Sequence, residues 1–477
     1  MAPHEFCGVV GVSLQGRGAA PYVYRGLRAL QHRGQESAGI ATSSHGTLHT
    51  RKGMGLVHDI FSRDLLDSLR GTVGIGHVRY STTGRSDLEN AQPLVIKLRD
   101  EDAALAHNGD LVNFERIRKR LQAQGVEFLG SADSETMAQM IATEYGRTRD
   151  LEAAIRRSCQ ELVGGYSVVM LVGSRLVGFR DPLGIRPLVL GTVDGGYAVA
   201  SESVALELMG GQLIRDLAPG EVLVIEKGQT IRSSRIQSTG ERAHCMFEWV
   251  YFSRPDSVVE GHSVYDVRHR IGQRLAQESP VEADLVIPVP DSSRPQALGF
   301  SEASGIPYAE GLIKNRFVER TFILPDQKRR EEEVRVKLHP VPGMLKGRRV
   351  VLLDDSIVRG TTIRSIIEMV RAAGATKVDV RVGCPPIVAP CYFGIDMKER
   401  KELAAAGKSE TEVARLIGAD SVHYLSMAGL VESIGLKEDQ LCLGCLTARY
   451  PVDVPEERRR FQRSLEDYQR GASTAAA

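Results

Sequence analysis

The sequence predicts two domains, an α+β domain followed by an α/β domain built on a parallel sheet. Its 477 residues allow two or three domains at roughly 150 residues each. Up to about residue 235, short β-like runs are separated by glycine-rich turns, which is typical of sheets packed against a few helices. Beyond about residue 240, strand-like runs alternate with helical patterns, which is typical of a parallel sheet.

In the first half, strand-like runs are expected at five places: 7–14, 72–80, 166–181, 196–201 and 221–228. The polar segment 233–244 (SSRIQSTGERAH) is expected to be a linker. We therefore place the first domain at residues 7–235 and the second at 240–450. Residues 451–477 form a charged segment that is expected to be a solvated helix and a disordered tail.

In the second half, strands are expected at 283–290, 348–355 and 377–382. Four apolar residues after the second of these strands recur at i, i+3, i+4 and i+7, and so predict an amphipathic helix: Ile363, Ile366, Ile367 and Val370. Thr361 or Thr362 suits the N-cap of this helix, and Gly374 suits its end. A strand followed by a helix is the unit of a parallel sheet.

Composition narrows the class of protein. The net charge is +1, from 61 basic and 60 acidic residues, which argues against nucleic acid as a partner. Apolar residues make up 42% and charged residues 25%, as in an ordinary globular protein. The start of the chain has no signal-peptide pattern, and no run reaches the ~18 apolar residues of a membrane span. A cytoplasmic location without a membrane partner is therefore expected, and the seven cysteines do not indicate a secreted disulfide framework.

The turn between the strand at 348–355 and its helix carries the sharpest chemical signal. Asp354 and Asp355 end the strand, and Ser356-Ile357-Val358-Arg359-Gly360-Thr361-Thr362 leads into the helix. A loop that opens a helix offers free N–H groups and the positive end of the helix dipole to a phosphate. The adjacent acids can take sugar hydroxyls or Mg²⁺. The alternative is an ordinary capped turn with solvated acids; the coincidence of acids, glycine and threonines favours phosphate.

This string resembles the phosphoribosyl-pyrophosphate signature of type I phosphoribosyltransferases. The resemblance implies that seven of its residues bind phosphoribosyl pyrophosphate: Asp354, Asp355, Ser356, Arg359, Gly360, Thr361 and Thr362. The charged segment 327–340 could be a plain solvated loop. Beside a polyphosphate site it could also close over pyrophosphate, and Lys337 is then expected to contact the ligand.

Cys7 lies near the amino terminus, directly before a strand-like run. A free cysteine is usually a small buried apolar residue. If residues 1–6 were a leader that is removed, the α-amino group of Cys7, with an ordinary pKa of about 7.7–8, could act as its own base. Position alone leaves both interpretations open.

Four neighbouring strings resemble class II glutamine amidotransferases, whose fold is an N-terminal-nucleophile αββα sandwich: QHRGQES (31–37), GHVRYST (76–82), HNG (107–109) and SADSE (131–135). The resemblance implies that Cys7 is the nucleophile, with Asn108 and the Gly109 N–H stabilising the oxyanion. It also implies that Arg79 pairs with the α-carboxylate of glutamine and Asp133 with its α-amino group.

The two halves together resemble the amidophosphoribosyltransferase family from Cys7 to about residue 450. The resemblance implies the first step of de novo purine (IMP) synthesis: glutamine, water and phosphoribosyl pyrophosphate yield 5-phosphoribosylamine, glutamate and pyrophosphate. It implies one Mg²⁺ per subunit, held by Asp354, Asp355 and Ser292. It further implies purine nucleotides as feedback inhibitors and a homotetramer.

Four more cysteines remain: Cys245, Cys391 and the CxxC pair Cys442 and Cys445. Spacing alone makes them a weak metal site, with zinc as reasonable as iron. The resemblance implies that they hold one [4Fe–4S] cluster per subunit, as in the iron–sulfur branch of the family, in which residues 1–6 are a cleaved leader. Cys159 and Cys384 are interpreted as ordinary thiols.

Two rival functions would use part of the same residues. A regulator that binds phosphoribosyl pyrophosphate without amidotransferase chemistry has no need of Cys7, Arg79 and Asn108 together. Another class II amidotransferase, such as a glucosamine-phosphate or asparagine synthetase, has no use for the loop at 354–362. Both rivals therefore leave half of the sequence unexplained.

Overall fold

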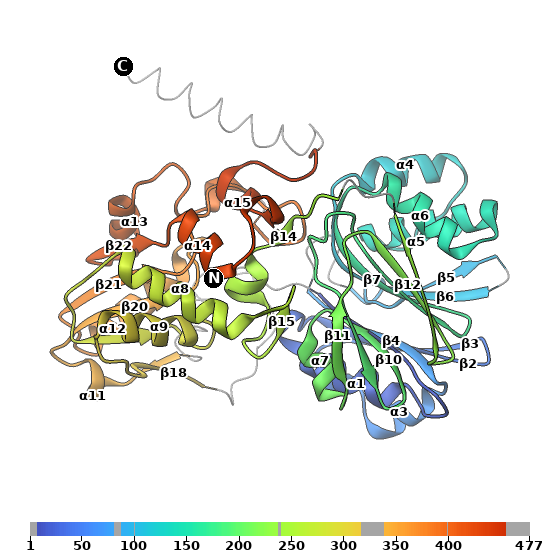
Figure 1. Ribbon diagram of the computed structural model, residues 1–477, viewed down its shortest axis with the longest axis horizontal. Coiled ribbons are helices and arrows are strands. Elements are labelled where there is room, and N and C mark those ends of the chain that lie inside the picture. The colour runs from blue at the N-terminus through green and yellow to red at the C-terminus, as the bar shows by residue number, and fades with distance from the viewer. Residues whose placement is uncertain are drawn as a thin grey trace, which may run out of the picture.

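The computed structural model describes residues 7–80, 87–99, 101–236, 240–315, 338–397 and 399–454. Figure 1 shows the two domains side by side, the first in blue to green and the second in yellow to red. The leader expected at residues 1–6, the charged segment around Lys337 and the tail from residue 455 lie outside the described residues.

The described part of the first domain contains two antiparallel sheets. The seven-stranded sheet has the order β11 (Gln212–Asp216), β9 (Val189–Val193), β10 (Gly196–Ala200), β1 (Gly8–Ser13), β4 (Val73–Arg79), β2 (Ser37–Ser44) and β3 (Thr47–Met54). The six-stranded sheet has the order β13 (Thr230–Arg235), β12 (Glu221–Glu226), β8 (Arg175–Arg180), β7 (Gly164–Val172), β6 (Glu101–Leu111) and β5 (Leu94–Leu98). The five strand-like runs predicted in this half all fall on these strands.

Helices cover the outer faces of both sheets (Figure 1). The seven-stranded sheet packs against α1 (Ala20–Ala29), α2 (Val57–Ile60), α3 (Arg63–Ser68) and α7 (Ser203–Leu208). The six-stranded sheet packs against α4 (Phe114–Ala123), α5 (Asp133–Thr148) and α6 (Leu151–Glu161).

Side-chain alternation in the strands explains this layering. In β1, Val9 joins the apolar core between the two sheets, whereas Val10 and Val12 join the core under the helices. Successive residues of a strand point to opposite faces, so a strand buried on both faces is apolar throughout. The predicted αββα sandwich is confirmed.

The second domain is built on a parallel sheet of β17 (Leu285–Pro288), β20 (Arg349–Asp354), β21 (Lys377–Val382) and β22 (Ser421–Tyr424). The principal helices around it are α8 (Val264–Glu278), α9 (Arg294–Ser304), α12 (Thr361–Ala372), α13 (Glu410–Ile417) and α14 (Met427–Ile434). One apolar core includes residues of α12 and α13, and a second includes residues of α8, α9 and α14. The predicted parallel sheet is confirmed.

Two local predictions were wrong. The N-cap of α12 is Gly360, with φ of +78°, and not a threonine, because the chain turns through a left-handed conformation that favours glycine. The expected linker at 233–244 begins later, because Ser233 to Arg235 pair with β12 as the end of β13.

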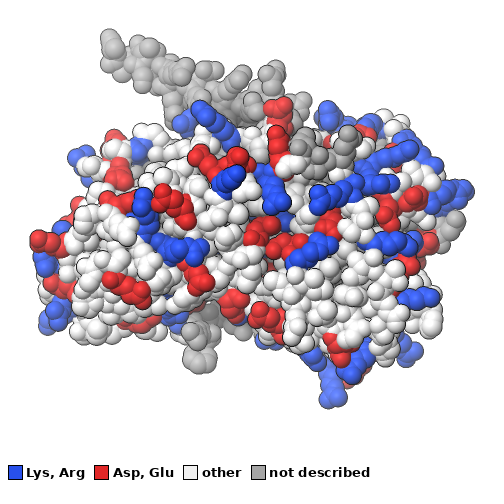
Figure 2. Space-filling view, viewed as in Figure 1, with Lys and Arg blue, Asp and Glu red and all other residues white. Residues whose placement is uncertain are grey.

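Shorter elements complete the described chain. They are η1 (Gln31–Arg33), β14 (His244–Cys245), η2 (Glu248–Phe252), β15 (Val258–Val259), β16 (His262–Ser263), β18 (Leu312–Lys314), β19 (Leu338–Pro340), α11 (Pro342–Leu345), η3 (Arg400–Glu402), η4 (Glu438–Gln440), β23 (Leu441–Cys442) and α15 (Gly444–Thr447). Within the described ranges, no helix combines the length and apolar character that crossing a membrane requires. Figure 2 shows basic and acidic side chains interspersed over the visible face.

Candidate functional site

Cys7 lies directly before β1, beside the end of β4. The strands are in register so that Gly8 faces Val78, and the thiol of Cys7 donates to the carbonyl of Tyr80 at 3.5 Å. Burial raises the pKa of the Cys7 thiol to about 11, against the lowering effects of the Tyr80 carbonyl contact and the Arg79 charge. At neutral pH the sulfur is therefore protonated, and it needs a base before it can act as a nucleophile.

Both residues predicted to bind glutamine carry charges that affect the pKa of the Cys7 thiol. Arg79 and Asp133 both contribute to its electrostatic environment, as does Glu36. The guanidinium of Arg79 pairs with Glu36 at 3.0 Å. The carboxylate of Asp133 accepts the backbone N–H groups of Leu111 and Ser134, at 2.9 and 2.8 Å. The structure thus places a cation and an anion near the thiol, as recognition of an amino acid's two charged groups requires.

Asn108 and Gly109 lie on β6, in the facing sheet. The two sheets are tied at this level because the Nε2 of His77, on β4, contacts the carbonyl oxygen of His107 at 3.0 Å. Asn108 is fully buried, and neither of its amide atoms has a hydrogen-bond partner among the described residues. A buried amide without partners is costly unless a ligand uses it. This observation fits an oxyanion donor.

Gly109 is held in a conformation that only glycine adopts without strain. Its φ is +145°, and a Cβ placed there would lie 2.0 Å from the carbonyl oxygen of Gly165. The strand β6 therefore approaches β7 more closely than a side chain would permit. Because glycine has no side chain, residue 109 does not itself shield its backbone N–H from a ligand.

The histidines near the thiol are poor candidates for its base. Burial lowers the pKa of His77 to about 3 and the pKa of His107 to about 4. Both imidazoles are therefore neutral at physiological pH, and the Nε2 of His77 is already engaged by a backbone carbonyl. The α-amino group of a processed Cys7 remains the simplest base.

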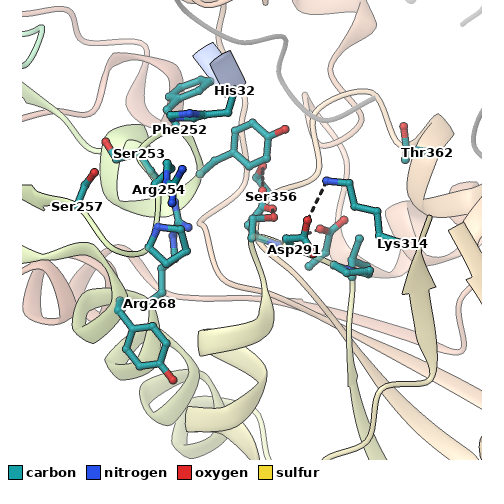
Figure 3. Close-up of a pocket in the computed structure, with 18 of the residues that line it drawn as sticks. His32, Phe252, Ser253, Arg254, Ser257, Arg268, Asp291, Lys314, Ser356 and Thr362 are labelled. Carbon is teal, nitrogen blue, oxygen red and sulfur yellow. Dashed lines mark hydrogen bonds and ion pairs between the residues drawn. The ribbon is translucent and has the colours of Figure 1, made fainter. Parts of the chain in front are cut away.

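A second site is a cavity of about 940 Å³ at the carboxyl end of the parallel sheet. Its lining comes from both domains: His32 follows α1, and Asp354 ends β20. Figure 3 shows Ser257 on one side of this cavity and Lys314 and Thr362 on the other. The volume suits a small phosphorylated ligand.

Asp354 and Asp355 form a pair of carboxyl groups on the cavity wall, the first half-buried and the second buried. Asp355 accepts from the hydroxyls of Ser292 and Ser356. Burial and repulsion from Asp355 raise the pKa of Asp354 well above its usual range, and burial likewise raises the pKa of Asp355. The two acids are therefore crowded, and a cation or a set of ligand hydroxyls would relieve both of them.

The start of α12 faces the same cavity. Gly360 and Thr362 line it, so the first turn of the helix offers N–H groups and a hydroxyl to a ligand. Arg359 lies elsewhere: its guanidinium pairs with Glu402 at 2.9 Å, and it is not among the lining residues. Thr361 is also absent from the lining.

The cysteines expected to hold a cluster come together from three parts of the chain. Cys245 and Cys442 face each other in the pairing of β14 with β23, and these two line one small cavity together with Cys391 and Cys445. Burial raises the pKa of every one of these thiols, to about 12 for Cys245. Arg186 is the charged residue of this lining.

The four cysteines and the aspartate pair are two separate sets of possible ligands, the first for an iron–sulfur cluster and the second for Mg²⁺. In the described ranges, no three histidine, cysteine, aspartate or glutamate side chains converge closely enough to hold a single metal ion. The four cysteines instead line one small cavity, which is compatible with a four-iron cluster that takes one cysteine on each iron. The pair Asp354 and Asp355 offers Mg²⁺ two hard oxygen ligands beside a hydroxyl, with the rest left to substrate and water.

Several residues that line the second cavity were not predicted from the sequence to be part of a site. Arg254, Ser257 and Arg268 line it, and so does His32 of the first domain. The string QHRGQES contains His32, but a string does not show which cavity its side chains enter. Their place is a result of domain packing.

Comparisons with known proteins agree with this geometry. A glutamine amidotransferase domain model matches residues 77–208. The amidophosphoribosyltransferase of Methanothermobacter thermautotrophicus is 49% identical over 453 residues, covering 94% of this chain and 95% of the relative. The Bacillus subtilis amidophosphoribosyltransferase is 44% identical over 460 residues, covering 95% and 96%. A solved structure of the B. subtilis glutamine phosphoribosylpyrophosphate amidotransferase, complexed with ADP and GMP, matches with a TM-score of 0.87 and 43% identity over 94% of this chain and 98% of that one.

An amidotransferase sandwich joined to a phosphoribosyl-binding sheet defines a two-domain pentosyltransferase that uses glutamine as its nitrogen source. The chain belongs to the amidophosphoribosyltransferase family, which performs the first step of purine biosynthesis.

Proposed function

We propose that the two sites carry out one coupled reaction. At the first, glutamine and water yield glutamate and ammonia; at the second, that ammonia displaces pyrophosphate from C1 of phosphoribosyl pyrophosphate and gives 5-phosphoribosylamine. The observation that carries the proposal is the cavity lined by both His32 of the first domain and Asp354 of the second. A ligand in this cavity is walled in part by the domain that releases ammonia.

At the first site, the thiol of Cys7 attacks the side-chain amide carbon of glutamine. The α-amino group of Cys7, freed by removal of residues 1–6, takes the thiol proton and passes it to the departing nitrogen. Asn108 and the N–H of Gly109 hold the oxyanion, which supports a use for the unpartnered amide. Water then attacks the thioester carbon, which releases glutamate and restores the thiol.

At the second site, the first turn of α12 and the hydroxyl of Thr362 hold a phosphate. Asp354 and Asp355 take the ribose hydroxyls and one Mg²⁺ per subunit, with Ser292 beside them. When bound, Mg²⁺ supplies positive charge that neutralises pyrophosphate as it departs. Lys314, on the same cavity wall, is paired with Asp291 at 2.9 Å and can exchange that partner for a phosphate.

The four cysteines Cys245, Cys391, Cys442 and Cys445 are proposed to hold one [4Fe–4S] cluster per subunit. Their convergence from three distant segments on one cavity supports this. Such a cluster would act as a staple between β14, β23 and the segment around Cys391, and its loss would destabilise the fold. Because burial favours the protonated thiols, cluster binding would release protons and would be weakened at low pH.

Regulation and assembly are proposed from the relatives. The similar B. subtilis structure holds ADP and GMP, which supports purine nucleotides as inhibitors of this chain. From membership of the family we also propose that the chain forms a homotetramer and acts in the cytoplasm.

The test is the Cys7→Ala variant. It should lose glutamine-dependent formation of 5-phosphoribosylamine and keep the ammonia-dependent reaction, because only the first site is changed. Pyrophosphate release with each nitrogen source measures this. Retention of both activities would contradict the assignment of the nucleophile. Intact mass of the purified protein checks the removal of residues 1–6.

A further inference from the structure

A three-residue segment after β10, Ser201 to Ser203, joins the nucleophile strand to the wall of the second cavity. The hydroxyl of Ser201 accepts the N–H of Val9, two residues from Cys7, at 3.0 Å. The hydroxyl of Ser203 accepts the N–H of Val258, a lining residue of the second cavity, at 2.8 Å. Glu202 lies between these two anchors.

The carboxylate of Glu202 is shared between the domains. One oxygen contacts first-domain groups, the Nε2 of His32 at 2.7 Å and the guanidinium of Arg33. The other oxygen contacts second-domain groups, accepting the N–H of Arg254 at 2.9 Å and the hydroxyl of Ser257 at 2.7 Å. Glu202 is fully buried, and His32, Arg254 and Ser257 all line the second cavity.

Arg33 connects Glu202 to the backbone of the nucleophile Cys7. Its Nε donates to the carbonyl oxygen of Cys7 at 3.3 Å, and its Nη2 and Nη1 form a two-pronged pair with Glu248 at 2.7 and 3.1 Å. Although burial opposes ionisation, His32 and Arg33 hold the pKa of Glu202 below its ordinary range. The carboxylate is therefore charged at working pH, and all four of its contacts are with donors.

We propose that Glu202 is a positioning residue that couples the two half-reactions. It fixes His32 on the wall of the phosphoribosyl cavity while it holds Arg33 against the backbone of Cys7, so that ammonia released at Cys7 meets a closed junction between the domains. The inference rests on the proposed roles of Cys7 and of the cavity. Glu202 affects how efficiently ammonia passes between the sites and takes part in neither chemical step.

The chemistry of the contacts explains why a carboxylate is needed. A glutamine at this position has the same size, but one of its two terminal groups is an NH₂ donor. That donor must face either Arg33 or the backbone N–H of Arg254, and both of these groups can only donate. The Glu202→Gln variant therefore loses at least one contact on one side of the junction and leaves the other side and the Arg33–Glu248 pair intact.

The test measures pyrophosphate and glutamate released in the same reaction. In the parent protein this ratio should be near one with phosphoribosyl pyrophosphate in excess. We expect Glu202→Gln to lower it at least about twofold, because glutamate still forms while part of the ammonia escapes. The control is Glu221→Gln, which removes another buried carboxylate of the first domain, paired with Arg215 at 2.7 Å and absent from both sites, and which should keep the parent ratio.

A ratio in Glu202→Gln equal to that of the parent would overturn the proposal, and so would an equal fall in Glu221→Gln. If Glu202→Gln does not fold, Ser257→Ala removes one of the four contacts and must still lower the ratio; an unchanged ratio then overturns the proposal. If the parent itself releases glutamate without pyrophosphate, the proposed function fails before the role of Glu202 is tested.

Discussion

Asn108 offers a sharp test of the first site, because its contribution to activity and its contribution to stability are separable. Its side chain is fully buried, yet neither amide atom has a hydrogen-bond partner among the described residues. The Asn108→Ala variant therefore breaks no hydrogen bond of the described structure. It removes one proposed donor to the oxyanion.

The expected effect is large on one reaction and absent from the other. Loss of one oxyanion donor typically lowers kcat about 10²–10³-fold, or about 2.7–4 kcal/mol of transition-state stabilisation. Glutamine-dependent release of glutamate should fall by that factor. Ammonia-dependent release of pyrophosphate should stay at the parent rate, since the second site is untouched.

Asn113 is a matched control in the same domain. Its amide donates to the carbonyl of Glu161 at 2.8 Å and accepts the N–H of Val163 at 3.1 Å. Asn113→Ala should therefore lose about 2 kcal/mol of stability, at about 1 kcal/mol per bond, and lower Tm by about 4–8 °C while it keeps glutaminase activity. Asn108→Ala should show the reverse pattern. A glutaminase rate within about threefold of the parent in Asn108→Ala would refute the oxyanion role.

Further predictions concern the second site, the buried histidine and the cysteines. Asp355→Asn should abolish both routes to 5-phosphoribosylamine and yet raise Tm at pH 7, because a carboxyl whose pKa is raised in the fold loses stability as pH rises through that pKa; a lower Tm in this variant would contradict the crowding of the two acids. The free energy of unfolding should fall as pH falls from about 6.5 towards 4, since His77, with a folded pKa of about 3, takes up a proton only on unfolding. His77→Gln should reduce that slope by about 1.4 kcal/mol per pH unit in denaturant titrations, and an unchanged slope would exclude His77 as its source. Protein purified without oxygen should contain four iron and four acid-labile sulfide per chain, and Cys445→Ser should lose them; zinc in their place would contradict the cluster.

The sequence was sufficient where a function follows from adjacent residues. The strand ending at Asp354 and the helix from Thr361 were predicted because their apolar patterns have different periods and the turn between them is a continuous string. Arg359 belongs to the same string, but its side chain turns to Glu402, a partner 43 residues away. A string shows which residues are neighbours along the chain and not which way each side chain points.

The contacts that join the two sites could not be predicted from the sequence. His32 and Glu202 are 170 residues apart, and Glu202 meets Ser257 only because the domains pack against each other. The family resemblance, by contrast, places the four cysteines together, and in the structure all four line one small cavity; their binding of a cluster stays a prediction. Their spacing alone gave no such grouping, because Cys245 and Cys442 meet through a short parallel pairing of distant segments.

The central claim is that ammonia from glutamine reaches the phosphoribosyl cavity inside one protein. It is tested most directly by supplying glutamine with a ¹⁵N-labelled side-chain amide together with excess unlabelled ammonium at a pH low enough that free ammonia competes weakly, and by trapping the product for mass spectrometry. The account predicts that 5-phosphoribosylamine carries ¹⁵N in nearly every molecule. A product whose label matches the bulk ammonium pool would contradict it.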